Sequence, residues 1–117
     1  MVRHYVPDSG DIVSLSAPAD PAGRAIQKGR PALVLSPAQY NRPSGLALVC
    51  PITNTARLGS WEVRLPPSGP ATGVILSDQV SCIDWTARRA RLLGKAPPGI
   101  VEEVRDKLAP LLGLESP

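Results

Sequence analysis

The sequence predicts a single small domain, residues 1–117, of the β-rich α+β class, with a barrel of short strands and one C-terminal helix. Fourteen prolines and ten glycines recur between short apolar runs, which is typical of a β-rich barrel. The hydrophobic content of 43% is ordinary for a globular chain, and 117 residues suffice for one small core. A long helical pattern appears only at the end of the chain.

The first predicted strand, residues 11–15, follows a turn at residues 7–10 and alternates like a half-buried strand. Residues 16–29 show no periodicity, and we interpret them as a mobile loop that leads directly into the next strand.

The second predicted strand lies within residues 29–37 and is the chain's central block. An apolar run with β-branched Val34 ends there at Ser-Pro. Pro31 is expected at the first strand position because it has no N–H to give. Arg30 then lies at the mouth of the strand in an extended conformation. Its guanidinium either binds phosphate or anchors the strand end through a salt bridge.

The remaining elements are expected in order after residue 37. Residues 38–41 form one helical turn, and residues 46–52 form a second buried strand. That strand ends in Thr53, Asn54 and Thr55, which either cap a turn or point donors at a ligand. Further strands are expected at residues 61–65, 73–76 and 80–83, the first with one dry face and the last half buried.

Two charged or amphipathic segments complete the chain. Arg88, Arg89 and Arg91 form either a phosphate-binding stripe or the solvated face of a strand. A helix over residues 100–112 carries apolar residues at helical spacing, and we expect its apolar face to close the barrel.

The composition restricts the chemistry that the chain can perform. One histidine, His4, and two cysteines, Cys50 and Cys82, give no metal-ligand spacing, and reduced cysteines are expected, as in the cytoplasm. No signal peptide or membrane span is predicted, and no cofactor is implied. A net charge of +3 permits a polyanionic partner without requiring one. The remaining Arg, Thr, Asn, Ser and Asp side chains at strand ends suit stabilisation of a pentavalent phosphate. The substrate would then bring its own nucleophile, as RNA does with its 2′-hydroxyl.

Several blocks of the sequence, in order, resemble the MazF/PemK family of toxin endoribonucleases, and most closely its MazF branch. These blocks are residues 5–11, residues 29–37 with Tyr40 and Asn41, and residues 49–53, 73–80 and 85–88. The resemblance implies a small SH3-like barrel of the CcdB/PemK kind that forms a homodimer. It also implies metal-independent cleavage of single-stranded mRNA, and a MazE-like antitoxin whose C-terminal segment covers the RNA groove.

The resemblance makes Arg30 and Thr53 the catalytic pair, and matches Asp78 to an aspartate with a base role in the Kid branch. The general base stays open, because residues 24–27 lack the loop glutamate of many relatives and Leu76 replaces an arginine of the Kid branch. The residues expected to contact RNA are Arg24, Lys28, Asn54, Thr55, Arg57, Ser77, Gln79 and Arg88.

Two other functions are compatible with the same barrel. One is a non-catalytic, CcdB-like toxin that binds a protein target such as gyrase, and the other is an adaptor without activity. The absent loop glutamate favours the CcdB-like toxin, whereas the intact Arg30 and Thr53 favour RNA cleavage more strongly.

Overall fold

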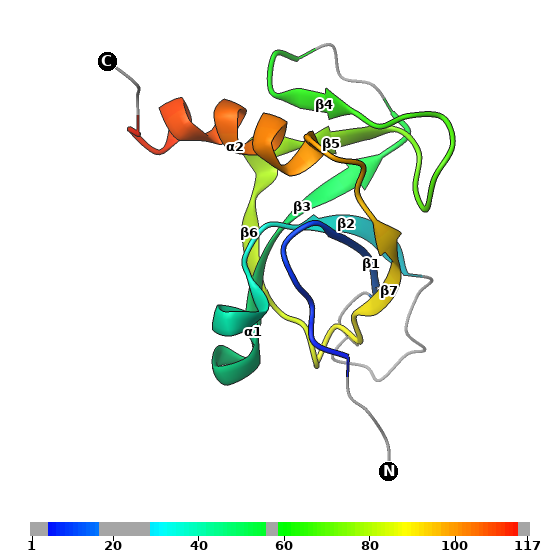
Figure 1. The fold of residues 1–117 in the computed structure, drawn as a ribbon, viewed down its shortest axis with the longest axis vertical. Helices are drawn as coiled ribbons and strands as arrows, with labels where there is room; N and C mark the ends of the chain where they lie inside the picture. The colour runs from blue at the N-terminus through cyan, green and yellow to red at the C-terminus, as the bar shows by residue number, and fades with distance from the viewer. Residues whose placement is uncertain (1–4, 17–28, 56–58, 115–117) are drawn as a thin grey trace, which may run out of the picture.

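A computed structural model describes residues 5–16, 29–55 and 59–114 of the chain. Within these residues, seven strands form one antiparallel sheet in the order β4-β5-β3-β2-β1-β7, with β6 paired to β3 off this path. In Figure 1, β2, β1 and β7 curl round one part of the molecule, and α2 lies along β4 and β5. The predicted β-rich α+β fold with a C-terminal helix is confirmed. The elements are β1 (Asp11–Leu15), β2 (Arg30–Val34), α1 (Ala38–Ser44), β3 (Leu46–Thr53), β4 (Glu62–Arg64), β5 (Val74–Leu76), the 3-10 turn η1 (Ser77–Gln79), β6 (Ser81–Asp84), β7 (Arg91–Lys95) and α2 (Ile100–Leu111).

The central strands are buried on both faces, because apolar clusters lie on the two sides of the sheet. Ile12 and Leu33 belong to the cluster that α2 covers, whereas their neighbours Val13 and Val34 belong to the other. The predicted half-buried alternation of β1 was therefore wrong, since only Ser14 of this strand is partly exposed. Two covered faces explain why the β2 sequence reads as a continuous apolar run.

Asn41, within the most diagnostic sequence block, holds the α1 region to the sheet through a buried polar network. Its Nδ2 donates to the carbonyl oxygens of Pro7 (2.7 Å) and Ser36 (2.9 Å). Its Oδ1 accepts from Ser36 Oγ (2.6 Å), which in turn accepts from the Leu48 N–H (2.8 Å). The Asn41 carbonyl accepts from the Trp85 indole N–H (2.9 Å). The sequence blocks that contain Ser36, Asn41 and Trp85 therefore stabilise the fold through buried hydrogen bonds in which the polar groups find partners.

A second network surrounds Asp11, whose side chain is almost fully buried at the start of β1. Its carboxylate accepts hydrogen bonds from the Tyr5 hydroxyl and from the Asp8 backbone N–H, and forms an ion pair with Lys95 of β7. Asp8 in turn accepts from the Ala38 N–H (2.9 Å), which is the main reason that the pKa of Asp8 is lowered. The segment at residues 5–11 thus joins β1, β7 and the start of α1.

Several local predictions differ from the structure. The predicted single turn at residues 38–41 continues to Ser44 and ends at Gly45, whose φ of +73° is the left-handed conformation that glycine accepts. β6 is more exposed than predicted, because among the described strands it pairs only with β3. In α2, the predicted apolar face is buried as far as Leu108, but the side chains of Leu111 and Leu112 are exposed.

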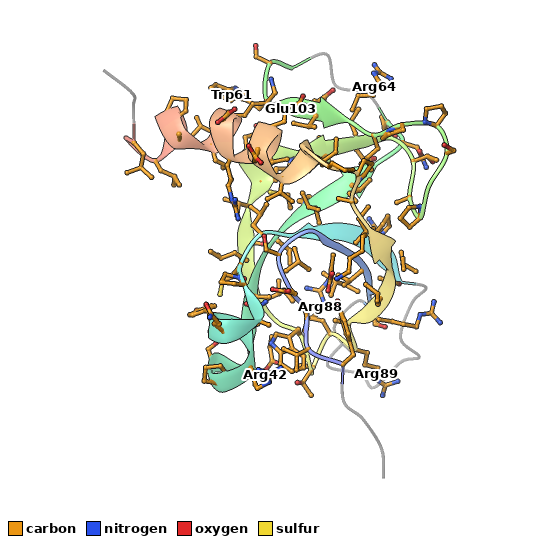
Figure 2. The ribbon with its side chains drawn as sticks, in the orientation of Figure 1. Arg42, Trp61, Arg64, Arg88, Arg89 and Glu103 are labelled. Carbon is orange, nitrogen blue, oxygen red and sulfur yellow. The ribbon has the colours of Figure 1, made fainter. Side chains whose placement is uncertain are left out.

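The three arginines near residue 90 do not share a strand face as predicted. Arg88 and Arg89 lie in the turn before β7, and only Arg91 belongs to that strand. In Figure 2, Arg88 and Arg89 lie at the end of the molecule opposite Arg64. Across the described ranges, no helix is long and apolar enough to cross a membrane.

Candidate functional site

Arg30 and Thr53 lie opposite each other on neighbouring antiparallel strands. Arg30 is the first residue of β2 and Thr53 is the last residue of β3. Ala32 of β2 pairs with Pro51 of β3. Two residues further along this antiparallel register, Arg30 lies opposite Thr53, and the two side chains are on the same face of the sheet. β2 begins at Arg30, so Pro31 is its second residue rather than its first as predicted. The prediction of Arg30 at a strand mouth is confirmed.

These two side chains line a cavity of about 380 Å³, called here the Arg30–Thr53 cavity. Thr55 and Gln79 supply further polar groups to it, and Pro31 and Pro51 form part of its wall. The Thr55 N–H donates to Thr53 Oγ1 (3.1 Å), which orients the hydroxyl and leaves its hydrogen free to donate to a ligand.

Arg30 is exposed and forms no ion pair with any residue that the structure describes. The alternative of an anchoring salt bridge at the strand end therefore finds no partner within those residues. The exposed Arg30 guanidinium beside the Thr53 hydroxyl offers several hydrogen-bond donors and a permanent positive charge to an anion.

A second cavity, of about 370 Å³, adjoins the first because both are lined by Arg30, Pro31, Pro51 and Gln79. Arg88 also lines it, and the Nε of Arg88 donates to the Ser16 carbonyl (2.6 Å). That bond holds the guanidinium in a fixed place. The two cavities together present Arg30 and Arg88 along a continuous surface, as an extended polyanion requires.

Neither Asp78, the predicted base, nor Ser77, a predicted RNA contact, lines the Arg30–Thr53 cavity. Asp78 lines a separate hollow with Trp61 and Glu62, and it does not line the Arg30–Thr53 cavity. Ser77 is 0% exposed, so its predicted contact with RNA is wrong for this conformation. Both residues follow β5 in η1, and the tight turn directs only Gln79 of its three side chains into the cavity.

Cys50 of β3 carries a thiol that is fully buried. Burial, with a smaller contribution from the Asp78 charge, raises the pKa of Cys50 to about 12. The thiol is therefore protonated at neutral pH, which makes it a packing residue and not a nucleophile.

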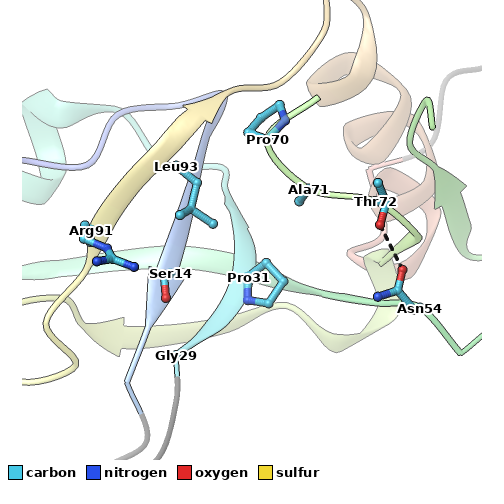
Figure 3. Close-up of a pocket in the computed structure, with 9 residues that line it drawn as sticks. All are labelled: Ser14, Gly29, Pro31, Asn54, Pro70, Ala71, Thr72, Arg91 and Leu93. Atoms are coloured by element: carbon cyan, nitrogen blue, oxygen red, sulfur yellow. Dashed lines mark hydrogen bonds between the residues drawn. The ribbon is translucent and has the colours of Figure 1, made fainter. Parts of the chain in front are cut away.

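Asn54 points away from the Arg30–Thr53 cavity into a third one, of about 270 Å³, shown in Figure 3. Its Oδ1 accepts from Thr72 Oγ1 (3.1 Å). The adjacent Gly73 has a φ of +110°, and a Cβ there would lie 2.2 Å from the Thr53 carbonyl oxygen. Gly73 thus allows the 72–73 segment to press against Thr53 and Asn54. Sequence reasoning placed Gly73 in a diagnostic block without this role, because close approach of backbones leaves no local pattern.

Three predicted RNA contacts, Arg24, Lys28 and Arg57, and most of the predicted loop at residues 16–29 lie outside the described residues. Within residues 5–16, 29–55 and 59–114, no group of three or more His, Cys, Asp or Glu side chains is placed to hold a metal ion.

Residues 8–112 match the family model described as PemK-like, MazF-like toxin of type II toxin-antitoxin system. The endoribonuclease toxin MazF of Escherichia coli K12 is 40% identical over 115 residues, which cover 97% of this chain and 100% of that protein. The endoribonuclease toxin ChpB of the same strain is 41% identical over 109 residues, covering 88% and 91%. A MazE–MazF crystal structure from Deinococcus radiodurans has a chain 44% identical, with a TM-score of 0.83, covering 96% of this chain and 100% of that chain.

Proposed function

This chain belongs to the PemK-like, MazF-like toxin family of type II toxin-antitoxin systems, and we propose that it cleaves single-stranded RNA at the Arg30–Thr53 cavity without a metal ion. It is an endoribonuclease toxin, as its relatives are named. The observation that carries the proposal is the cross-strand placement, in one cavity, of an oriented hydroxyl and a guanidinium that forms no ion pair with any described residue.

In the proposed reaction, the 2′-hydroxyl oxygen of the RNA attacks the adjacent phosphorus while the P–O5′ bond breaks. Arg30 stabilises the charge that develops on the phosphoryl oxygens, and the Thr53 hydroxyl donates to the same group. Because the nucleophile is already next to the phosphorus, its fixed position supplies much of the barrier reduction. The products are a 2′,3′-cyclic phosphate and a 5′-hydroxyl.

The position of Asp78 outside the cavity favours a non-bridging phosphate oxygen as the first acceptor of the 2′-hydroxyl proton. The 5′ oxygen takes up a proton as it leaves, which balances the reaction. Arginine is no alternative as a base, because its guanidinium keeps its proton at neutral pH.

We further propose a cytoplasmic homodimer that a MazE-like antitoxin inhibits. The MazF chain from D. radiodurans is found in complex with MazE, which supports a related partner for this chain. The exposed Leu48 (41%) and the neighbouring strand β6, which pairs only with β3 among the described strands, offer a surface that a second copy would bury. An acidic antitoxin segment would compete with RNA for Arg30 and Arg88.

The test is cleavage of labelled single-stranded RNA in EDTA by the wild-type protein and two variants. We expect Arg30→Ala to lower the cleavage rate about 100-fold or more, because removal of one hydrogen-bond donor to the transition state has an effect of this size in other enzymes. Arg64→Ala, which removes an exposed strand arginine away from every described cavity wall, should cleave like wild type. A 2′-deoxy substitution 5′ of the cut should abolish cleavage and retain binding. A requirement for Mg²⁺, or full activity of a folded Arg30→Ala variant, would contradict the mechanism. Absence of any cleavage would favour the CcdB-like alternative.

A further inference from the structure

We propose that the cavity of about 270 Å³ in Figure 3, the Asn54–Arg91 cavity, binds one nucleobase of the RNA and selects a carbonyl-bearing base over adenine. The inference rests on the proposed RNA cleavage and adds to it a specificity site. The cavity lies between the end of β3 and the β1–β7 pair, and no wall of it contains Thr53 or Arg30.

The walls combine flat apolar surfaces with polar groups at two ends. Pro31, Pro70 and Leu93 form apolar walls, while Asn54 and Arg91 lie at opposite ends of the cavity in Figure 3. Single-stranded RNA is read by splayed bases that stack on side chains and hydrogen-bond through their edges. A guanidinium plane and proline rings supply such a stacking surface.

The polar side chains of the cavity present mainly donors. The Thr72 hydroxyl donates to Asn54 Oδ1, which fixes the amide so that its Nδ2 donor faces away from Thr72 and is available to a ligand. Arg91 lies directly across the strand pair from Ser14, and its guanidinium points toward that side chain in Figure 3. Arg91 forms no hydrogen bond or ion pair with any described residue. Such donors bind the carbonyl oxygens of guanine, uracil and cytosine, and an arginine can bond to guanine O6 and N7 together. Adenine offers only ring nitrogens as acceptors, and its exocyclic amine is a donor that would face the donors of the cavity.

The size of the cavity and its position agree with this ligand. Drug-sized ligands occupy cavities of roughly 300–1,000 Å³, so about 270 Å³ suits a single base. Asn54 follows Thr53 directly, and Pro31 follows Arg30, with Pro31 lining both this cavity and the Arg30–Thr53 cavity. Because successive strand residues face opposite sides of a sheet, the Asn54–Arg91 cavity opens on the face opposite Arg30 and Thr53, and a nucleotide next to the scissile phosphate would enter it by passing round the strand ends at Pro31.

The experiment measures cleavage of an RNA library with randomised positions around the cut, by sequencing the products. We expect wild-type protein to disfavour adenine at one position next to the cut. Arg91→Ala should reduce that discrimination, and kcat/KM on the preferred RNA, by about ten- to a hundredfold. Thr72→Val, a near-isosteric change that frees Asn54 to rotate, should reduce discrimination at the same position with smaller effect on kcat. Arg64→Ala is the matched control and should leave the profile unchanged.

The outcomes separate this inference from the proposed function. If wild-type protein cleaves but Arg91→Ala and Thr72→Val keep the wild-type preference at every position, the base site is wrong and the cleavage mechanism stands. A uniform loss of rate in Arg91→Ala with unchanged preference would assign Arg91 to a phosphate and overturn base selection. Failure of wild-type protein to cleave any RNA would overturn both. As a readout independent of cleavage, anisotropy with 2′-deoxy-substituted RNA should show the same base preference in binding.

Discussion

Replacing Asn41 by alanine should destabilise the protein while leaving its chemistry unchanged. Asn41 belongs to the block that most strongly indicated an RNase family, yet its side chain is 0% exposed. It contacts Pro7 and Ser36 and lines none of the described cavities. The structure therefore assigns it to folding rather than to RNA.

The magnitude follows from the groups that lose their partners. Asn41→Ala leaves the Pro7 carbonyl and the Ser36 carbonyl each without its Asn41 donor, and the Ser36 hydroxyl without its acceptor. Each buried group left unsatisfied costs about 1–3 kcal/mol, and a water that enters the vacated space recovers part of this. We expect a loss of about 3–5 kcal/mol, a large part of the roughly 5–15 kcal/mol stability of a typical domain.

Urea denaturation at one fixed protein concentration measures this loss, because association would make the midpoint concentration-dependent. Gln39→Ala, an exposed substitution on the same helix, is the control and should change stability by less than about 0.5 kcal/mol. Cleavage by folded Asn41→Ala protein at low temperature should match wild type. A loss below about 1 kcal/mol would refute the network's importance, and normal stability with abolished cleavage would reverse the assignment.

The other predictions concern backbone contact, titration and assembly. Gly73→Ala should displace Thr53 and lower kcat about tenfold or more. Gly69→Ala adds backbone strain but no close contact, so it should lower only the stability, by about 1–3 kcal/mol. Cleavage rates and melting curves of both variants distinguish these effects. The pKa of Cys50 is about 12 in the folded protein and 9.0 ordinarily, so the unfolded chain loses this proton first as the pH rises. The contribution of Cys50 to the free energy of unfolding is therefore fully present below pH 9 and is lost as the pH rises toward 12. Cys50→Ala should flatten that part of the stability–pH curve, and an unchanged slope would contradict it. Light scattering at micromolar concentration should give a dimer, and Leu48→Asp should shift the mass toward a monomer without unfolding; a dimeric mass for that variant would exclude this surface.

The sequence by itself determined most secondary-structure elements and the position of Arg30 at the start of a strand. Short apolar runs punctuated by proline and glycine are local signals, so the strands at residues 30–34 and 46–53 and the helix from residue 100 were predicted with small errors at their ends. The Arg-Pro dipeptide placed Arg30 at a strand mouth for the same reason, since the restriction that proline imposes acts on its neighbours. The family motifs singled out Thr53, and the structure places it in the same cavity as Arg30.

Only the tertiary structure decided which polar residues meet. The antiparallel register joins Arg30 to Thr53, whereas the tight turn after β5 buries Ser77 and directs Asp78 to another hollow. The burial of β1 on both faces, and the close approach that requires Gly73, likewise depend on strands distant in the chain. Such contacts follow from register and packing between elements, and a sequence read segment by segment carries no signal for them.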